Sequence, residues 1–446
     1  MNWAGVSRFI QKMLPSPFSI AILLTVVAFL LALVLGEDNS AASLSETWVN
    51  GIWKKGQLVF AFQMMFMLVL GHILALSKPV SQFVAYLVNR FCHDTASAAF
   101  VVTLFTMIMA FFNWGLGLVF GAVFARKIAD ESFANNRPLN FALIAACGYS
   151  GLMVWHGGLS GSSLVKVAEP GHLTDMMGVN MAAIPLSATV FSPMNICASI
   201  VILILTPVVM RWVGKKSSGN LLNISSKDQP EQLEEPSGAD KLDASRWFGK
   251  AIGVLILTSA IYSAAIHQNI AALGFITPNW INTVLLGLAM VFHASIRSFL
   301  ASSKLAIRGA SGILLQFPLY FGIAALVQEA GMIEAFSKTV SNSSATAFNV
   351  FTFISAGVVN VFVPSGGGQW VVQGPLIIEG CHNLGIPYPK AILSLAYGDQ
   401  LTNMLQPFWA LPLLGITGLK IKDILPYTLL LMLIGIVVYL SVILIF

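Results

Sequence analysis

Long apolar runs broken by short polar segments make up most of this chain. Runs of close to 20 residues recur along its whole length, and a helix of that length crosses the hydrocarbon core of a bilayer. We therefore predict an all-α polytopic membrane protein with about nine full transmembrane helices plus two re-entrant hairpins and two broken helices. Continuous spans are expected near 18–35, 56–76, 195–211, 249–266, 280–295, 309–329 and 424–446.

Two apolar stretches, 95–126 and 347–380, are interrupted in the middle and predict the re-entrant hairpins. Two further stretches predict broken helices, with breaks at 155–163 and near 397–407. Residues 363–370 read VPSGGGQW, and each glycine costs a helix interior about 1 kcal/mol relative to Ala. Irregular backbone at bilayer depth typically forms a solute site. The helix expected from Gln369 would direct its free N–H groups at the glycines and favour an anion. A tight turn between packed helices is the alternative.

The interruptions recur in the same order in two parts of the chain. Asn113 and Asn360 each precede a glycine-rich break, and a second break follows roughly 40 residues later in both parts. The pattern of basic loops makes the two parts run in opposite directions across the membrane. We predict two inverted-repeat halves, residues 1–213 and 248–446, the architecture of many secondary transporters.

Residues 214–247 differ sharply in composition, because charged residues stand there among Ser, Pro and Gly. We expect a cytoplasmic linker between the halves. The loop 267–279 has no Lys or Arg, whereas basic residues follow the next span, so this loop is expected outside. The N-terminus is then cytoplasmic and the C-terminus periplasmic.

Composition narrows the class of protein further. The chain is 57% hydrophobic and 10% charged, whereas a soluble domain is about one quarter charged. Its net charge of +5 therefore reports topology and not nucleic-acid binding. Its four cysteines are isolated and lack ligand spacing, so we expect no metal and no cofactor.

Asp399 is the candidate coupling residue, because a carboxylate at membrane depth is costly and usually functional. It could carry a proton or, together with Asn403 and carbonyls of an unwound helix, bind sodium. His156 lies in the matching break of the first half and could meet a carboxylate or relay a proton. For both Asp399 and His156 a purely structural role is the alternative.

Hydroxyl groups, amides and glycines at the breaks are the candidates for binding an anionic solute. The tryptophans beside the breaks predict either an apolar wall or an interfacial belt. No Lys or Arg is expected at the breaks, so a single carboxylate would be met by helix N-termini and hydroxyls. The predicted substrate-binding residues are Asn113, Gly115, Gly117, Ser160, Ser162, Asn360, Ser365, Gly366, Gly367, Gly368 and Trp370.

Three motifs resemble the bacterial short-chain fatty acid transporter family: NWGLGLV at 113–119, VPSGGG at 363–368 with Trp370, and QPFWALP at 406–412. The resemblance extends over essentially the whole chain. It implies an inner-membrane carrier of butyrate- or acetoacetate-like monocarboxylates. The residues at the breaks lead us to expect coupling to a proton or sodium gradient, and whether the carrier acts alone or as a homo-oligomer stays open. It assigns no ligand to an individual residue.

Two other functions compete with this one. A sodium-coupled carrier of dicarboxylates is disfavoured by the lack of Lys and Arg at the breaks. An intramembrane enzyme would need a serine or paired carboxylates activated by neighbours. Ser160, four residues after His156, is the nearest candidate nucleophile, and no carboxylate is expected to orient that histidine.

Overall fold

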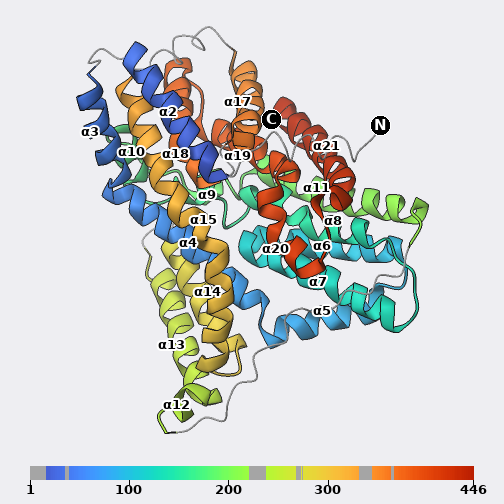
Figure 1. The fold of residues 1–446 in the computed structure, drawn as a ribbon. Helices are drawn as coiled ribbons and strands as arrows, with labels where there is room; N and C mark the ends of the chain where they lie inside the picture. Colours follow the sequence, from blue (N-terminus) through green and yellow to red (C-terminus); the bar gives the residue numbers. More distant parts are fainter. Residues whose placement is uncertain are drawn as a thin grey trace.

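The computed structural model describes residues 17–35, 40–219, 238–267, 273, 275–330, 344–362 and 366–446. Within these residues all regular elements are helices (Figure 1). The all-α prediction is confirmed. The expected linker is only partly described, because α11 ends at Lys216, α12 begins at Asp240, and 220–237 lie outside the described residues.

One group of helices packs around the long helix α15, on the left of Figure 1. Its members are α2 (Pro17–Leu35), α3 (Ala41–Ile52), α4 (Lys55–Ala75), α13 (Arg246–Ala265), α14 (Pro278–Phe292) and α15 (Ile296–Glu329). The connection between the expected spans 18–35 and 56–76 contains α3, and the span expected at 309–329 is the second part of α15. Ser295 starts α15 earlier than expected because its side chain accepts a hydrogen bond from the Ser298 N–H.

A second group surrounds the first hairpin, on the right of Figure 1. It contains α6 (Thr95–Phe112), α7 (Trp114–Ala134), α8 (Phe141–Tyr149), α11 (Pro193–Lys216), α20 (Pro407–Thr417) and α21 (Ile421–Ile445). Helix α4 joins the two groups, because it packs against α14 and α15 on one side and α7 on the other.

The remaining elements are short or belong to the second hairpin. They are α5 (Lys78–Phe91), η1 (Ser150–Met153), η2 (Trp155–Gly157), α9 (Ser162–Lys166), α10 (His172–Met177), η3 (Leu186–Ala188), α12 (Asp240–Ala244), α17 (Ala345–Phe362), α18 (Gly366–Leu384), α19 (Tyr388–Thr402) and η4 (Asn403–Leu405). The pairs α6–α7 and α17–α18 each pack together.

Local chemistry explains where the first hairpin begins and turns. Helix α6 starts at Asp94, whose carboxylate accepts a hydrogen bond from the Ser97 N–H at 2.7 Å; this bond is the main reason that the pKa of Asp94 is lowered. The break then occupies a single residue, Asn113, whose side chain accepts from the Leu116 N–H at 2.7 Å and starts α7. The turn is therefore tighter than the expected break at 113–117.

The second break of the second half lies within the expected range of 397–407, in its later part. Helix α19 continues regularly through Asp399 to Thr402 and is followed by η4 at 403–405. The expectation of an unwound helix around Asp399 is wrong. Gly398 is needed for packing, because a side chain there would collide with the backbone carbonyl of Phe353 in α17.

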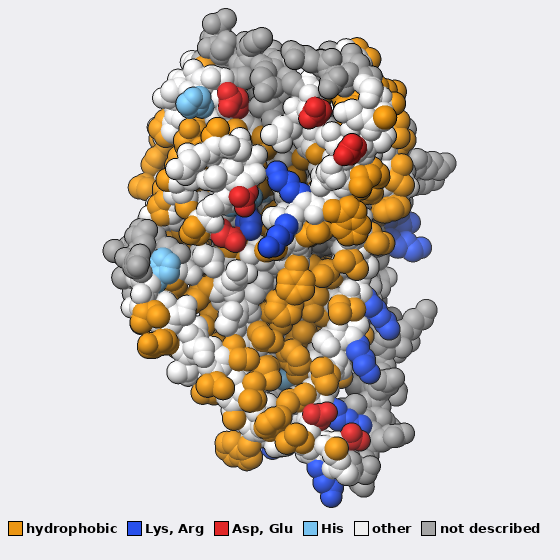
Figure 2. All heavy atoms as spheres, turned by 90° about the vertical axis from the view of Figure 1, so that its left-hand side faces the viewer, with side chains coloured by type: hydrophobic (Ala, Val, Ile, Leu, Met, Phe, Trp, Pro, Cys, Tyr) orange, Lys and Arg blue, Asp and Glu red, His pale blue; other side chains and the backbone are white. Residues whose placement is uncertain are grey.

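Six stretches within the described residues are long and apolar enough to span a membrane: Lys55–Ala75, Thr95–Phe112, Phe141–Lys166, Pro193–Lys216, Arg246–Ala265 and Ile421–Ile445. Several shorter apolar helices accompany them. Figure 2 shows a broad hydrophobic area on the face that carries the first group of helices. On α13, Val254 is 53% exposed and Ile261 is 67% exposed, which is typical of a lipid-facing surface. The protein is a multi-pass membrane protein; the predicted count of nine crossings and the inverted repeat stay predictions.

Candidate functional site

The centre of the candidate site is a contact between the two halves of the chain. Nδ1 of His156, in η2, lies 2.5 Å from Oδ2 of Asp399, in α19, and both side chains are fully buried. The carboxylate also lies beside the first turn of α18, because a side chain at Gly366 would come within 2.9 Å of Oδ2. The structure thus brings together three residues that were selected separately from three different breaks.

The hydrogen-bond partners of His156 define which of its ring nitrogens accepts and which donates. The Ser163 N–H, which can only donate, points at Nε2 from 3.2 Å, and the Ser163 hydroxyl oxygen lies 2.9 Å from the same nitrogen. Nε2 is therefore the acceptor, and Nδ1 carries the hydrogen that it donates to Asp399. Trp155 stacks on it with a centroid distance of 4.5 Å, which fixes the plane of the ring.

The other carboxylate oxygen of Asp399 has a different environment. Oδ1 is buried and makes no hydrogen bond within the described part of the chain. A buried acceptor without a partner is costly, and more so when it is charged. Oδ1 is therefore the atom at which this site can take up a proton or contribute to a cation site.

The expectation that no carboxylate orients His156 is wrong, because Asp399 does so from 243 residues away. The serine that contacts the ring is Ser163 and not Ser160. Ser160 instead accepts a hydrogen bond from the Trp114 N–H at 2.9 Å and so joins the break to the start of α7. The order Ser163–His156–Asp399 resembles a catalytic triad, but all three side chains are fully buried and the Ser163 N–H competes for Nε2.

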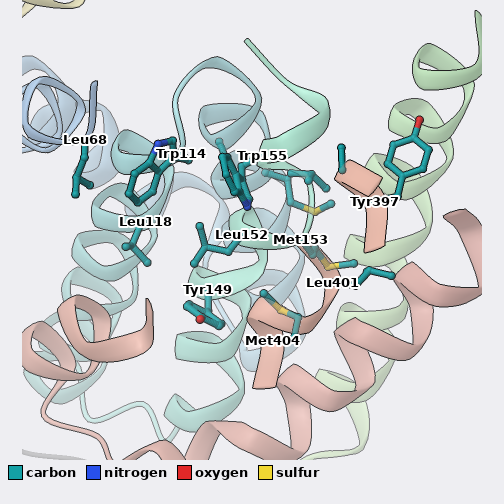
Figure 3. Close-up of a cluster of buried hydrophobic side chains, with 14 of the residues drawn as sticks. Leu68, Trp114, Leu118, Tyr149, Leu152, Met153, Trp155, Tyr397, Leu401 and Met404 are labelled. Atoms are coloured by element: carbon teal, nitrogen blue, oxygen red, sulfur yellow. The ribbon is translucent and has the colours of Figure 1, made fainter. Parts of the chain in front are cut away.

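A narrow cavity adjoins this cluster, and three tryptophans form much of its wall. Trp114 lies 5.8 Å from Trp155 and 5.2 Å from Trp409 between ring centroids; Figure 3 shows Trp114 and Trp155 side by side with Leu152 nearby. The free space, ≈ 20 Å³, holds about one water molecule. The lining residues are Met64, Trp114, Leu152, Trp155, Ser162, Phe317, Gly366, Gly367, Asn403 and Trp409.

The wall is thus mostly apolar, with Ser162 and Asn403 as its polar side chains. Trp114 and Trp155 are 5% and 6% exposed, so the interfacial-belt interpretation is wrong for both. The apolar-wall interpretation fits their positions.

The three glycines at 366–368 lie in the first turn of α18, whereas the helix was expected to begin after them, at Gln369. Each glycine leaves room for different neighbouring side chains. Gly366 faces the His156–Asp399 contact, Gly367 faces the rings of Phe60 and Phe317, and Gly368 faces the ring of Tyr320. Ser365 lies outside the described residues. Gly366 and Gly367 border the cavity, and Gly368 does not.

The amides at the two hairpin turns hold the turns in place. Asn113 Nδ2 donates to the Met67 carbonyl at 3.4 Å. Asn360 Nδ2 donates to the Asp399 carbonyl at 2.7 Å and to Asn403 Oδ1 at 3.0 Å. These asparagines are therefore positioning residues around the cavity.

Three predicted binding residues serve the packing instead. A side chain at Gly115 would collide with the Leu68 carbonyl, and one at Gly117 with the backbone of Ala110. Trp370 is fully buried away from the cavity lining, and its Nε1–H donates to His172 Nε2 at 2.9 Å.

Sequence reasoning missed one charged residue near the site. Lys166, the last residue of α9, is 4% exposed and pairs with Glu169. The expectation of no Lys at the breaks does not cover this residue, because Lys166 follows the break at 155–163 by one helical turn. Its signal was present: a lysine inside the apolar stretch 139–168 needs a buried partner. Within the described residues no group of three His, Cys, Asp or Glu side chains could hold a metal ion.

Comparisons with known proteins give a consistent result. Residues 3–446 match the family described as "Short chain fatty acid transporter". The chain is 34% identical over 433 residues to an Escherichia coli protein named "Putative short-chain fatty acid transporter", with 95% of this chain and 94% of that protein covered. A Haemophilus influenzae protein of the same name is 34% identical over 437 residues, with 95% and 94% covered.

Two solved structures share the fold. The YdaH transporter of Alcanivorax borkumensis aligns with a TM-score of 0.61 at 14% identity, over 96% of this chain and 98% of that one. The Neisseria gonorrhoeae protein MtrF, described among antimetabolite efflux pumps, aligns with a TM-score of 0.50 at 11% identity, over 98% and 97%. At these identities the likeness concerns the fold alone.

Proposed function

This chain belongs to the short-chain fatty acid transporter family, and from that membership we propose that it is a secondary active transporter of short-chain monocarboxylates such as butyrate and acetoacetate. The proposed location is the bacterial inner membrane, with a cytoplasmic N-terminus and a periplasmic C-terminus. The family and the relatives are transporters, so the intramembrane-enzyme alternative is excluded.

The observation that carries the proposal is the tryptophan-lined cavity beside the His156–Asp399 contact. Its apolar wall suits a short acyl chain, because burial of each CH₂ group contributes about 0.8 kcal/mol. The first turn of α18 and the Ser162 hydroxyl border the same cavity and can meet the carboxylate. The free space is smaller than any such acid, so binding requires the tryptophans or the first turn of α18 to shift.

We propose a proton as the coupling ion, bound at Oδ1 of Asp399. That atom is buried without a hydrogen-bond partner in the described structure, and the other oxygen of the same carboxylate lies close to Gly366, which lines the cavity. Protonation would remove a buried charge close to where the substrate carboxylate binds. Proton and substrate would therefore favour each other's binding, which is the coupling that a symporter needs.

Sodium is the second candidate, and a specific observation favours it. Oδ1 of Asn360 and Oε1 of Gln406 are buried acceptors without partners among the described residues, as is Oδ1 of Asp399. Hydrogen bonds to one another's backbones link the three residues. Oxygen atoms of this kind bind hard cations. A dicarboxylate is less suitable as substrate, because no Lys or Arg lines the cavity in the described structure to meet a second carboxylate.

Uptake of labelled butyrate into proteoliposomes tests the proposal. A proton gradient, acid outside, is expected to drive accumulation, and an inward sodium gradient at equal pH is not. Liposomes without protein control for passive diffusion of the neutral acid. Accumulation driven by sodium alone would overturn the proton assignment, and no protein-dependent uptake of butyrate or acetoacetate would overturn the substrate class.

A further inference from the structure

A buried lysine outside the cavity has no role in the function proposed so far. Nζ of Lys166 lies 2.5 Å from Oε2 of Glu169 and 2.9 Å from Oε1 of Gln63. The Lys166 side chain is 5% exposed, whereas that of Glu169 is 23% exposed. The cation is therefore held inside the protein, and its carboxylate partner is the more exposed of the two side chains.

One aromatic layer separates Lys166 from the cavity. Nζ lies 5.5 Å from the centre of the Phe60 ring, and that ring lies 6.0 Å from the ring of Phe317, which lines the cavity. Both rings press on Gly367. The charge is thus close enough to act on a carboxylate that approaches the cavity along this side.

The opposite side of the ion pair leads to the surface. Gln63 also donates to Asn279 at 2.9 Å, beside the loop 267–279 that the charge pattern predicts to lie outside. Lys54, exposed next to α4, donates to the Asp175 carbonyl of α10 at 3.3 Å. Figure 2 shows acidic and basic side chains gathered above the broad apolar area on this face of the molecule. Lys166 therefore lies between a charged outer surface and the cavity.

We propose that Lys166 is a second carboxylate site, at which an incoming short-chain acid replaces Glu169 before it passes Phe60 into the cavity. The inference rests on the proposed function. The exchange conserves charge, because one carboxylate leaves the ammonium group as another arrives. An unpaired buried lysine is strongly unfavourable, so the Lys166–Glu169 pair keeps the route closed until a carboxylate takes its place.

In this scheme, replacing Lys166 and replacing Glu169 change the KM for uptake in opposite directions. If the ion pair were only structural, the two replacements would not have opposite effects on KM. Lys166→Met removes the cation and is expected to raise the KM for butyrate uptake about tenfold with Vmax close to wild type. Glu169→Gln removes the competitor and is expected to lower KM about threefold. Lys166→Arg keeps the charge and is expected to stay within about threefold of wild type.

A double variant covers the cases in which a single variant does not fold, above all Glu169→Gln, which leaves the buried lysine unpaired. Lys166→Met combined with Glu169→Gln leaves no unpaired charge, and such replacements are well tolerated; its KM is expected to rise as in Lys166→Met. An unchanged KM in Lys166→Met or in the double variant, or a rise in KM for well-folded Glu169→Gln, would overturn this inference and leave the proposed function standing. Wild-type protein that does not transport butyrate would overturn the proposed function and the inference together.

Discussion

The two hairpins carry the same sequence signature, an asparagine followed by glycines, and use it differently. In the first hairpin, Gly115 and Gly117 press against backbone of α4 and α6. In the second, Gly366 and Gly367 face side chains: the His156–Asp399 contact and the rings of Phe60 and Phe317. Backbone cannot move aside, but side chains can. The first hairpin is therefore packed rigidly and forms a fixed wall of the site. The second hairpin borders the place where the solute is expected to move.

The largest effect is expected from Gly117→Val, which tests the fixed wall. The added side chain meets Ala110 Cα at 2.7 Å, and overpacking against a rigid neighbour costs about 3 kcal/mol or more. We expect most of the folded protein to be lost from the membrane, as measured by size-exclusion chromatography of detergent extracts. Gly415→Ala is the control, because a side chain there meets nothing within 4 Å. Normal yield and normal transport for Gly117→Val would remove the distinction between the hairpins.

Gly367→Val tests the second hairpin and is expected to separate folding from transport. Its side chain meets the ring ends of Phe60 at 2.9 Å and Phe317 at 3.0 Å, which can rotate, so insertion should remain close to wild type. The methyl groups would fill the space beside the cavity, and we expect butyrate uptake to fall more than about tenfold. Wild-type uptake by well-folded Gly367→Val would show that the solute does not pass this glycine.

Asp399→Asn tests the contact between the halves. Asn keeps the size of the side chain and an oxygen for the His156 hydrogen bond but cannot titrate. We expect the variant to exchange labelled for unlabelled butyrate across vesicles while failing to accumulate it against a gradient, a loss of about tenfold in the accumulation ratio.

Asp130→Asn is the matched control, because Asp130 forms an exposed pair with Arg126 and such pairs contribute little. If Asp399 binds sodium instead, exchange by Asp399→Asn should also weaken and sodium should lose its effect. Full accumulation by Asp399→Asn would return the residue to a structural role.

The smallest effect is expected in the linker between the halves. Replacing residues 220–237 with a Gly–Ser sequence of equal length should leave uptake within about twofold, because a flexible chain of the same length preserves the span. The assay is butyrate uptake corrected for the amount of protein in the membrane. A large loss of uptake at normal protein levels would give this segment a part in the transport cycle.

The positions of the breaks were predictable from the sequence because helix-breaking residues stand inside apolar runs. Asn113, the glycines after Trp155 and those at 366–368 all mark places where the structure interrupts a helix. The exact turn residues were less predictable. The helix around Asp399 was expected to be unwound, but α19 is regular there, and Gly398 beside it allows close packing against the backbone of α17.

The side-chain contacts within the candidate site were not predictable, because they join residues that are far apart in the chain. Nothing near His156 in the sequence indicates Asp399, and nothing indicates that Ser163, not Ser160, would contact the imidazole. Lys166 was overlooked for a related reason: its partner Gln63 is 103 residues away. Polar and charged residues at membrane depth identify the groups that can bind a solute or an ion. Only the packing of the helices decides which of these groups contact one another.

The contacts of His156 with Ser163 extend the line of hydrogen bonds beyond the carboxylate. A backbone amide hydrogen cannot be handed on, but the Ser163 hydroxyl, whose oxygen lies 2.9 Å from Nε2, can release its proton and take up another. The imidazole therefore joins Asp399 to one further exchangeable group inside the protein. A carrier built in this way has a second end from which its acid can be reached, so tight coupling depends on keeping Ser163 away from water, and that side chain is fully buried.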